Sequence, residues 1–172
     1  MVWLGRGTRE NVRALGPCPA WLSGPSTSPL DAMDHRQRIA ERISRLGDPN
    51  DPNTPRPLLT IDEFFDGNDF PGSIGCNLSP APSPDRFYSL FKTIASRPDV
   101  KDIRIRIVDF DDADWPFTDT VFVMTCASVE EVKSWFDADL APDDVWEGFY
   151  PDESCEPYVV PPGTRPVAVW WD

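Results

Sequence analysis

The residues best suited to chemistry are four aspartates in one short stretch, DFDDAD, namely Asp109, Asp111, Asp112 and Asp114. Closely spaced carboxylates supply the oxygen ligands that Mg²⁺ and Ca²⁺ prefer. The EF-hand pattern fails, because Asp114 stands where that loop needs Gly and Thr120 where it needs Glu. Three interpretations stay open: a divalent-metal site, an acidic loop without a specific role, and a surface that recognises a basic partner.

The acidity of the chain extends well beyond that stretch. The 172 residues include 16 Lys+Arg and 29 Asp+Glu, a net charge of −13. Residues 1–57 carry 8 Lys+Arg against 6 Asp+Glu, whereas residues 58–172 carry 8 against 23, a net charge of −15. A surface of one sign attracts a partner of the opposite sign and speeds association. The same charge argues against binding nucleic acid through its phosphates.

These carboxylates are the predicted binding residues for a basic protein partner. The set comprises the four aspartates of the DFDDAD stretch and three residues further along the chain, namely Asp109, Asp111, Asp112, Asp114, Asp143, Asp144 and Glu147.

Other catalytic arrangements are poorly represented. His35 is the only histidine and stands between charged residues of a polar helix, which favours a surface position. The four cysteines show no CxxC spacing, and we expect Cys76 and Cys126 to be buried thiols. Asp62, Glu63, Asp66 and Asp69 could supply an acid–base pair, but the place of Asp62 and Glu63 in a helical first turn favours a capping role. The sequence predicts a protein that is not an enzyme and has no cofactor.

Hydrophobic spacing predicts the elements of the fold. Two Ser/Thr-x-x-Glu patterns, Thr60 with Glu63 and Ser128 with Glu131, are typical of capping boxes that begin helices. Alternating apolar residues predict strands, most clearly at Ile103, Ile105 and Ile107. The predicted helices span residues 34–46, 61–66, 84–96 and about 129–136, and the predicted strands span residues 73–78, 102–108, 119–126 and 166–171. Residues 139–164 should be a long loop with at most a helical turn at 143–147.

From residue 73 onward this order is strand, helix, strand, strand, helix, strand. It predicts an α+β, ferredoxin-like βαββαβ fold: a four-stranded antiparallel sheet in the order 4-1-3-2 with two helices on one face. The second sheet face would carry apolar and aromatic side chains and would need a cover. The loop of residues 140–164, the N-terminal helix or a second copy of the chain in a homodimer could supply it.

We expect three parts along the chain. Residues 1–32 form either a disordered tail or an extension from a misassigned upstream start, because Met33 opens the helical segment. Residues 33–57 form a helix and a Pro-rich linker, and residues 58–172 form a single α+β domain. No apolar run approaches the roughly 20 residues that span a bilayer, so we expect a cytoplasmic protein that does not bind membranes.

Several segments, EFFDGND, SIGCNL, WPFTDTVFVMTCASVEEVKSWF and the terminal WWD, resemble short uncharacterised proteins of actinobacterium-like genomes. The resemblance covers about residues 58–172 and implies no activity. Function therefore depends on the residues themselves. The leading hypothesis is a non-enzymatic acidic binding module for a basic protein, such as an immunity-type inhibitor. The alternatives are a divalent-metal-dependent enzyme that uses the Asp109–Asp114 cluster, and a dimeric small-ligand sensor built on the open sheet face.

Overall fold

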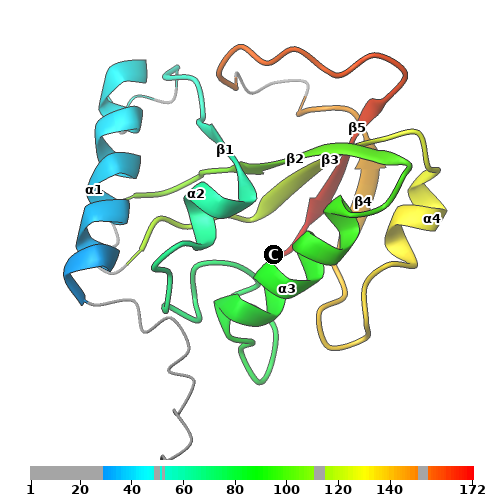
Figure 1. Ribbon diagram of the computed structural model, residues 1–172, viewed down its shortest axis with the longest axis horizontal. Helices are drawn as coiled ribbons and strands as arrows, with labels where there is room; N and C mark the ends of the chain where they lie inside the picture. Colours follow the sequence, from blue (N-terminus) through cyan, green and yellow to red (C-terminus); the bar gives the residue numbers. More distant parts are fainter. Residues whose placement is uncertain (1–28, 49–50, 52, 111–114, 151–154) are drawn as a thin grey trace, which may run out of the picture.

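A five-stranded antiparallel sheet forms the centre of the computed structural model, which describes residues 29–48, 51, 53–110, 115–150 and 155–172 (Figure 1). The strand order is β1-β2-β3-β5-β4. The strands are β1 (Leu58–Leu59), β2 (Val100–Arg106), β3 (Thr120–Thr125), β4 (Asp144–Glu147) and β5 (Arg165–Trp170). The helices are α1 (Pro29–Leu46), α2 (Ile61–Phe65), α3 (Pro84–Ala95) and α4 (Val129–Lys133).

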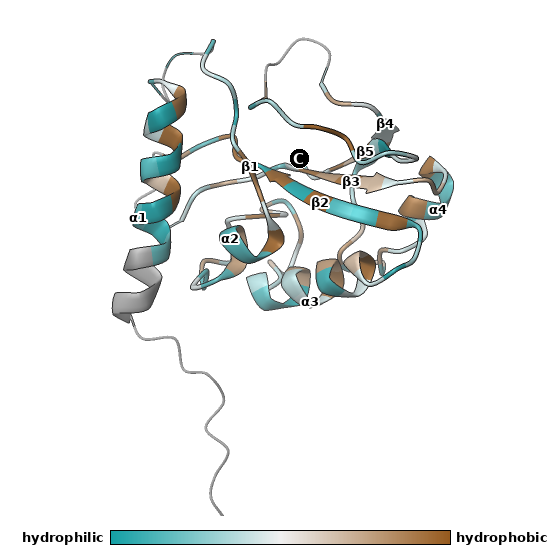
Figure 2. Cartoon of the chain, turned by 45° about the horizontal axis from the view of Figure 1, so that its top comes forward, coloured by the Kyte–Doolittle hydropathy of each residue, from teal (hydrophilic) through white to brown (hydrophobic). Residues whose placement is uncertain are grey.

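The main core lies between the helices and one sheet face. Successive side chains of a strand point to opposite faces, so Ile103 and Ile105 share a face with their cross-strand neighbours. Ile105 pairs with Val121, and Val121 pairs with Val169, so one buried apolar row crosses three strands. In Figure 2 the helices α2 and α3 lie on that side of the sheet and turn their apolar surfaces toward it.

Both predicted capping boxes are confirmed. Thr60 Oγ1 accepts from the backbone N–H of Glu63, and Glu63 Oε2 accepts from the backbone N–H of Thr60 at 2.8 Å. Ser128 and Glu131 make the same reciprocal pair at the start of α4. Because these bonds satisfy N–H groups that have no partner within the helix, they fix where two short helices begin.

Helix α1 packs against the same core as α2 and α3. Ile39 and Ile43, one turn apart, are 3% and 4% exposed and belong to the main core cluster. The apolar stripe that predicted this helix is therefore the face it buries. Of the predicted tail of residues 1–32, residues 29–32 form the first turn of α1, and the remainder lies outside the described residues.

The second sheet face is covered by the chain itself. We use the term covering segment for residues 148–150 and 155–160, which pack on a smaller apolar cluster around Phe122 and Met124. Phe149 meets Phe122 edge to face with ring centroids 4.8 Å apart. The Tyr158 hydroxyl donates to Asp102 at 2.6 Å. Of the three candidate covers named above, the loop of residues 140–164 supplies this contact.

The Tyr158 hydroxyl should lose its proton at a higher pH than an ordinary tyrosine. Burial and its hydrogen bond to Asp102 raise its pKa from 10.0 to about 12. The unfolded chain therefore loses this proton at lower pH than the folded chain. The contribution of Tyr158 to stability is present below pH 10 and is lost as the pH rises from 10 to about 12. Absorbance titration of the full chain should show a last tyrosinate step near 12.

Tyr158→Phe should remove that last step and lessen the loss of stability in the same pH range. Tyr88→Phe is the control, since Tyr88 donates to the exposed Asp62 and should leave the latest step in place. A latest step that survives in Tyr158→Phe would contradict the assignment.

The predicted ferredoxin-like topology is wrong in two respects: the sheet has five strands, and their order is not 4-1-3-2. Residues 73–78 form no strand, and only an isolated bridge joins Ile74 to Thr118. Gly75 has a φ of +61°, and Leu78 donates its backbone N–H back to Gly75 at 3.1 Å. This turn ends the extended run, so β5 pairs directly with β3 where the predicted first strand would have stood.

Two further segments differ from their predictions. Residues 144–147 form the edge strand β4 rather than a helical turn, with Val145 and Trp146 on opposite sheet faces. Cys76 and Cys126 are exposed thiols, not buried ones, because the first lies in the turn after Gly75 and the second follows the last residue of β3.

Candidate functional site

Four exposed aspartates gather at one end of the sheet. This end is defined by one row of paired residues that crosses β2, β3, β5 and β4, namely Arg106, Thr120, Trp170 and Asp144. Adjacent strands are about 4.8 Å apart, so residues just beyond this row on adjacent strands are neighbours, whereas β2 and β4 are three such spacings apart. We use the term acidic end for the exposed residues that lie on or just beyond the row, namely Asp109, Asp143, Asp144 and Asp172.

Asp143 is held firmly in place. Its Oδ2 accepts from the backbone N–H of Asp172 at 3.0 Å and from the Asn77 amide at 2.7 Å. These two hydrogen bonds favour the charged form and hold the pKa of Asp143 below its usual value. The carboxylate therefore stays ionised at neutral pH and joins the end of the chain to the turn after Gly75.

Asp144 protects the edge of the sheet. It is the first residue of β4, the last strand in the order, and its Oδ1 accepts from the backbone N–H of Val145 at 2.8 Å. That N–H is therefore satisfied within the chain instead of being offered to another strand. A charged side chain on a short edge strand disfavours pairing with a second sheet.

The structure brings together some of the predicted binding residues and separates another. Asp109, Asp143 and Asp144 lie at the acidic end, while Asp111, Asp112 and Asp114 lie outside the described residues. Glu147 ends β4 at the opposite end of the sheet, where it pairs with Arg165 at 2.8 Å. Asp172 was missed because the sequence places it far from the other carboxylates. Only the pairing of β4 with β5 brings it to Asp143.

The cationic side chain at this end of β2 is withdrawn from the surface. Arg106 is 3% exposed, pairs with Asp119 at 3.1 Å and lies 4.5 Å from the ring centre of Tyr150. Its charge is directed at Asp119 and the covering segment. Arg106 therefore adds little positive charge beside the exposed aspartates of the acidic end.

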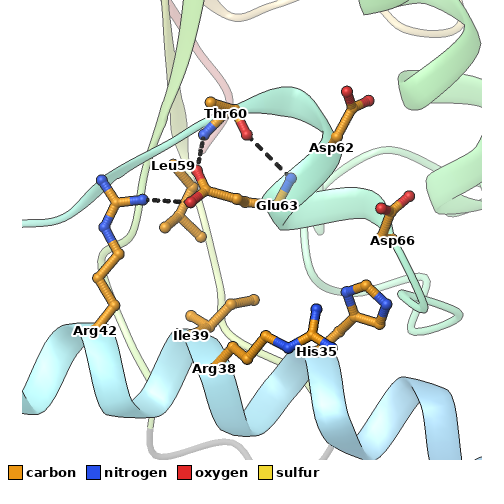
Figure 3. A pocket seen from close by; sticks show the side chains of 9 residues that line it. All are labelled: His35, Arg38, Ile39, Arg42, Leu59, Thr60, Asp62, Glu63 and Asp66. Carbon is orange, nitrogen blue, oxygen red and sulfur yellow. Dashed lines mark hydrogen bonds and ion pairs between the residues drawn. The ribbon is translucent and has the colours of Figure 1, made fainter.

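A second feature is a cleft between α1 and α2 with a volume of about 310 Å³ (Figure 3). One wall is a face of α1 with His35, Arg38 and Arg42, and the other carries Asp62, Glu63 and Asp66. From the sequence, His35 was expected only at the surface of a polar helix. The signal that could have placed it was the spacing of His35, Ile39 and Arg42, since residues four and seven apart share a helix face.

Among the described residues no three His, Cys, Asp or Glu side chains are grouped so that they could hold a metal ion. The metal hypothesis rested on Asp109, Asp111, Asp112 and Asp114, of which the last three lie outside the described residues. Among the described helices, none is both long and apolar enough to cross a membrane.

Comparisons with known proteins place the chain in a family. Residues 34–169 match the model of the family described as "Uncharacterized protein YfbO family". The chain is 46% identical over 140 residues to the "Uncharacterized protein YfbO" of Escherichia coli (strain K12), a match that covers 81% of this chain and 100% of that protein. No solved structure matches. The relative found is thus from Escherichia coli, and the actinobacterial part of the resemblance is not supported. The chain belongs to the YfbO family.

Proposed function

We propose that this protein is a non-enzymatic binding module that docks a basic protein partner on its acidic end. The observation that carries the proposal is the grouping of exposed Asp109, Asp143, Asp144 and Asp172 at one end of the sheet, beside an arginine that is buried. Clustered like charges speed encounter with an oppositely charged partner and fix its orientation.

The rigidity of the acidic end favours binding. Asp143 is fixed by two hydrogen bonds, and Asp144 is fixed to the backbone of its own strand. Side chains that are already ordered lose less entropy when a partner docks. Such a fixed acidic surface suits a basic cleft, and an enzyme that handles nucleic acid is a partner with that chemistry. An immunity-type inhibitor is the corresponding finer proposal.

The covered sheet face weighs against the small-ligand sensor. That hypothesis needed an open face, and the covering segment packs its aromatic side chains on it. Pairing of two copies through the β4 edge is also disfavoured, because Asp144 satisfies the edge N–H of Val145 and would meet its own charge in a second copy. A homodimer through another surface stays a prediction.

The test begins with the full chain, tagged in its native host and recovered with bound proteins at low salt. A bound basic protein should leave as the salt concentration rises, since salt screens charge attraction. Its affinity is then measured for the wild type and for the double variant Asp109→Lys/Asp144→Lys. We expect the double variant to bind at least about tenfold more weakly at low salt, with a flatter salt dependence.

The control makes the same change in charge at the opposite end of the sheet. Glu130→Lys/Glu147→Lys alters two exposed carboxylates, one on α4 and one at the end of β4. This control should bind within about twofold of the wild type. Thermal unfolding of both variants checks that each is folded. Equal loss of affinity in both variants would mean that only the net charge matters, and unchanged affinity in both would exclude the acidic end.

A further inference from the structure

One apolar side chain of the covering segment is turned to the solvent. Val159 is 88% exposed, and no other large apolar residue of the described chain is exposed. Its neighbours Tyr158 and Val160 are only partly exposed and pack on the smaller apolar cluster of the sheet. Because more exposed and less exposed side chains alternate here, residues 157–160 have the pattern of an extended strand with Val159 on its outer face.

This strand has one backbone edge that is open. The backbone N–H of Glu156 donates to the backbone oxygen of Arg56 at 2.9 Å, in a short bridge between Arg56 and Cys155. The N–H groups of an extended chain alternate between its two edges, so those of Tyr158 and Val160 lie on the same edge as that of Glu156. Within the described residues, neither group makes a backbone–backbone hydrogen bond. We use the term open edge for the backbone N–H and C=O groups of Tyr158 and Val160.

The open edge is held in place by the rest of the fold. Glu156 pairs with Arg42 of α1, and the Tyr158 hydroxyl donates to Asp102 at 2.6 Å. In Figure 1 the chain from this segment to β5, drawn in orange and red, follows the upper border of the molecule. An edge that is already ordered loses little entropy when a second strand pairs with it.

The charge around the open edge favours a second copy of the chain as its partner. With a net charge of −13, two copies repel each other, so they associate best where charged side chains are absent. Residues 157–164 include no charged residue. The charged residues on either side, Glu156 and Arg165, are neutralised by ion pairs with Arg42 and Glu147.

The spacing of the prolines also suits pairing between identical strands. Pro157 and Pro161 are equally far from Val159. In an antiparallel pair centred on Val159, Tyr158 of each copy lies opposite Val160 of the other, and these residues exchange N–H···O=C bonds. Proline has no N–H, but Pro157 then lies opposite Pro161 of the second copy, where antiparallel strands exchange no bonds. The two prolines therefore limit the length of the pairing without removing any of its hydrogen bonds.

We propose that this protein forms a twofold-symmetric homodimer in which the open edges of two copies pair antiparallel about Val159. Val159 of one copy lies directly opposite Val159 of the other, in the close kind of pair whose Cα atoms are about 4.5 Å apart. Two β-branched side chains in such a pair stabilise the contact. Because the contact is small, we expect a dissociation constant of about 10–100 µM.

Sedimentation velocity of the full chain tests the dimer. Between about 5 µM and about 1 mM, the weight-average mass should rise from that of the monomer toward twice that value. Val159→Asp places two like charges opposite each other and should weaken association at least about tenfold. Ala81→Asp adds the same charge at an exposed position in the loop before α3, and its dissociation constant should stay within about twofold of the wild type.

A disulfide cross-link tests the register. With glutathione disulfide as the oxidant, Val159→Cys should form a linked dimer, since Cα atoms about 4.5 Å apart lie within disulfide range. Pro162→Cys is the control, because residue 162 is also exposed but lies about 20 Å from its counterpart in this register. The exposed Cys76 and Cys126 set the background, which the wild type measures.

Three results would overturn the proposal. The wild type would remain monomeric up to about 1 mM, Val159→Asp would associate as tightly as the wild type, or Val159→Cys would cross-link no faster than Pro162→Cys. Thermal unfolding checks that each variant is folded. None of these variants alters a carboxylate of the acidic end, so this proposal and the proposed function fail independently.

Discussion

Replacing Trp171 with alanine is expected to lower the free energy of unfolding by about 3–5 kcal/mol, the usual cost of truncating a large buried aromatic residue. Trp171 is 1% exposed, and its ring centre lies 5.5 Å from that of Phe87 and 5.7 Å from that of Phe136. Its Nε1–H donates to the backbone oxygen of Leu140 at 3.2 Å. The residue therefore joins α3, the segment after α4 and the end of β5.

Two controls separate the ring from its position in the chain. Trp171→Phe keeps an aromatic ring but loses volume and the bond to Leu140, and should cost about 1–2 kcal/mol. Trp170→Ala removes the same side chain one residue earlier, where it is only partly buried and belongs to neither core cluster. It should cost about 1 kcal/mol. Denaturant unfolding followed by circular dichroism measures all three, and similar losses for Trp170→Ala and Trp171→Ala would contradict this account.

Local signals predicted much of the fold. The two capping boxes fixed the starts of α2 and α4, because each pattern is satisfied by bonds within four residues of chain. The alternation of Ile103, Ile105 and Ile107 predicted β2 and the face that it buries. Such features need no knowledge of distant segments, which is why sequence alone could supply them.

The errors came from features that depend on distant partners. Leu58 and Leu59 form a strand of two residues, too short to show any period, and exist as β1 only through pairing with Arg106 and Ile105. Residues 144–147 are extended because they pair with β5. In contrast, the residue types at positions 73–78 alternate as they do in a strand, but Gly75 has a positive φ and the chain turns there.

The sequence predicted that the candidate site is acidic, but not where in the fold its carboxylates lie. Counting charges predicted an acidic surface, but several of its carboxylates are paired with arginines of the same chain. Glu156 pairs with Arg42, Asp139 pairs with Arg86, and Glu147 pairs with Arg165. Each pairing neutralises a charge that the count treats as free. The pairing of strands, not the order of residues, then decides which remaining carboxylates become neighbours.

Arg106→Leu is expected to lower the free energy of unfolding by about 3 kcal/mol, because it leaves the carboxylate of Asp119 without its buried partner. Arg106 is 3% exposed, bonds to Asp119 at 3.1 Å and stacks on Tyr150 at 4.5 Å. Tyr150 in turn shares a 3.1 Å hydrogen bond with Thr120. The substitution therefore loosens the first part of the covering segment as well as the start of β3.

The matched control is two residues away on the same strand. Arg104 also bonds to an aspartate, Asp102, at 2.9 Å and lies 5.1 Å from the ring centre of Tyr158, but its side chain is 23% exposed. Water can replace part of what Arg104→Leu removes, so that variant should cost only about 1 kcal/mol. Denaturant unfolding gives the two energies, and hydrogen exchange shows where each variant opens.

The difference between the two arginines tests what holds the covering segment. If burial decides, Arg106→Leu should increase exchange in residues 148–150, and Arg104→Leu should affect residues 155–160 only weakly. Equal costs would instead mean that the aromatic stacking shared by both sites is the main contribution. In that case the apolar cluster around Phe122, and not the buried ion pair, would hold the segment on the sheet.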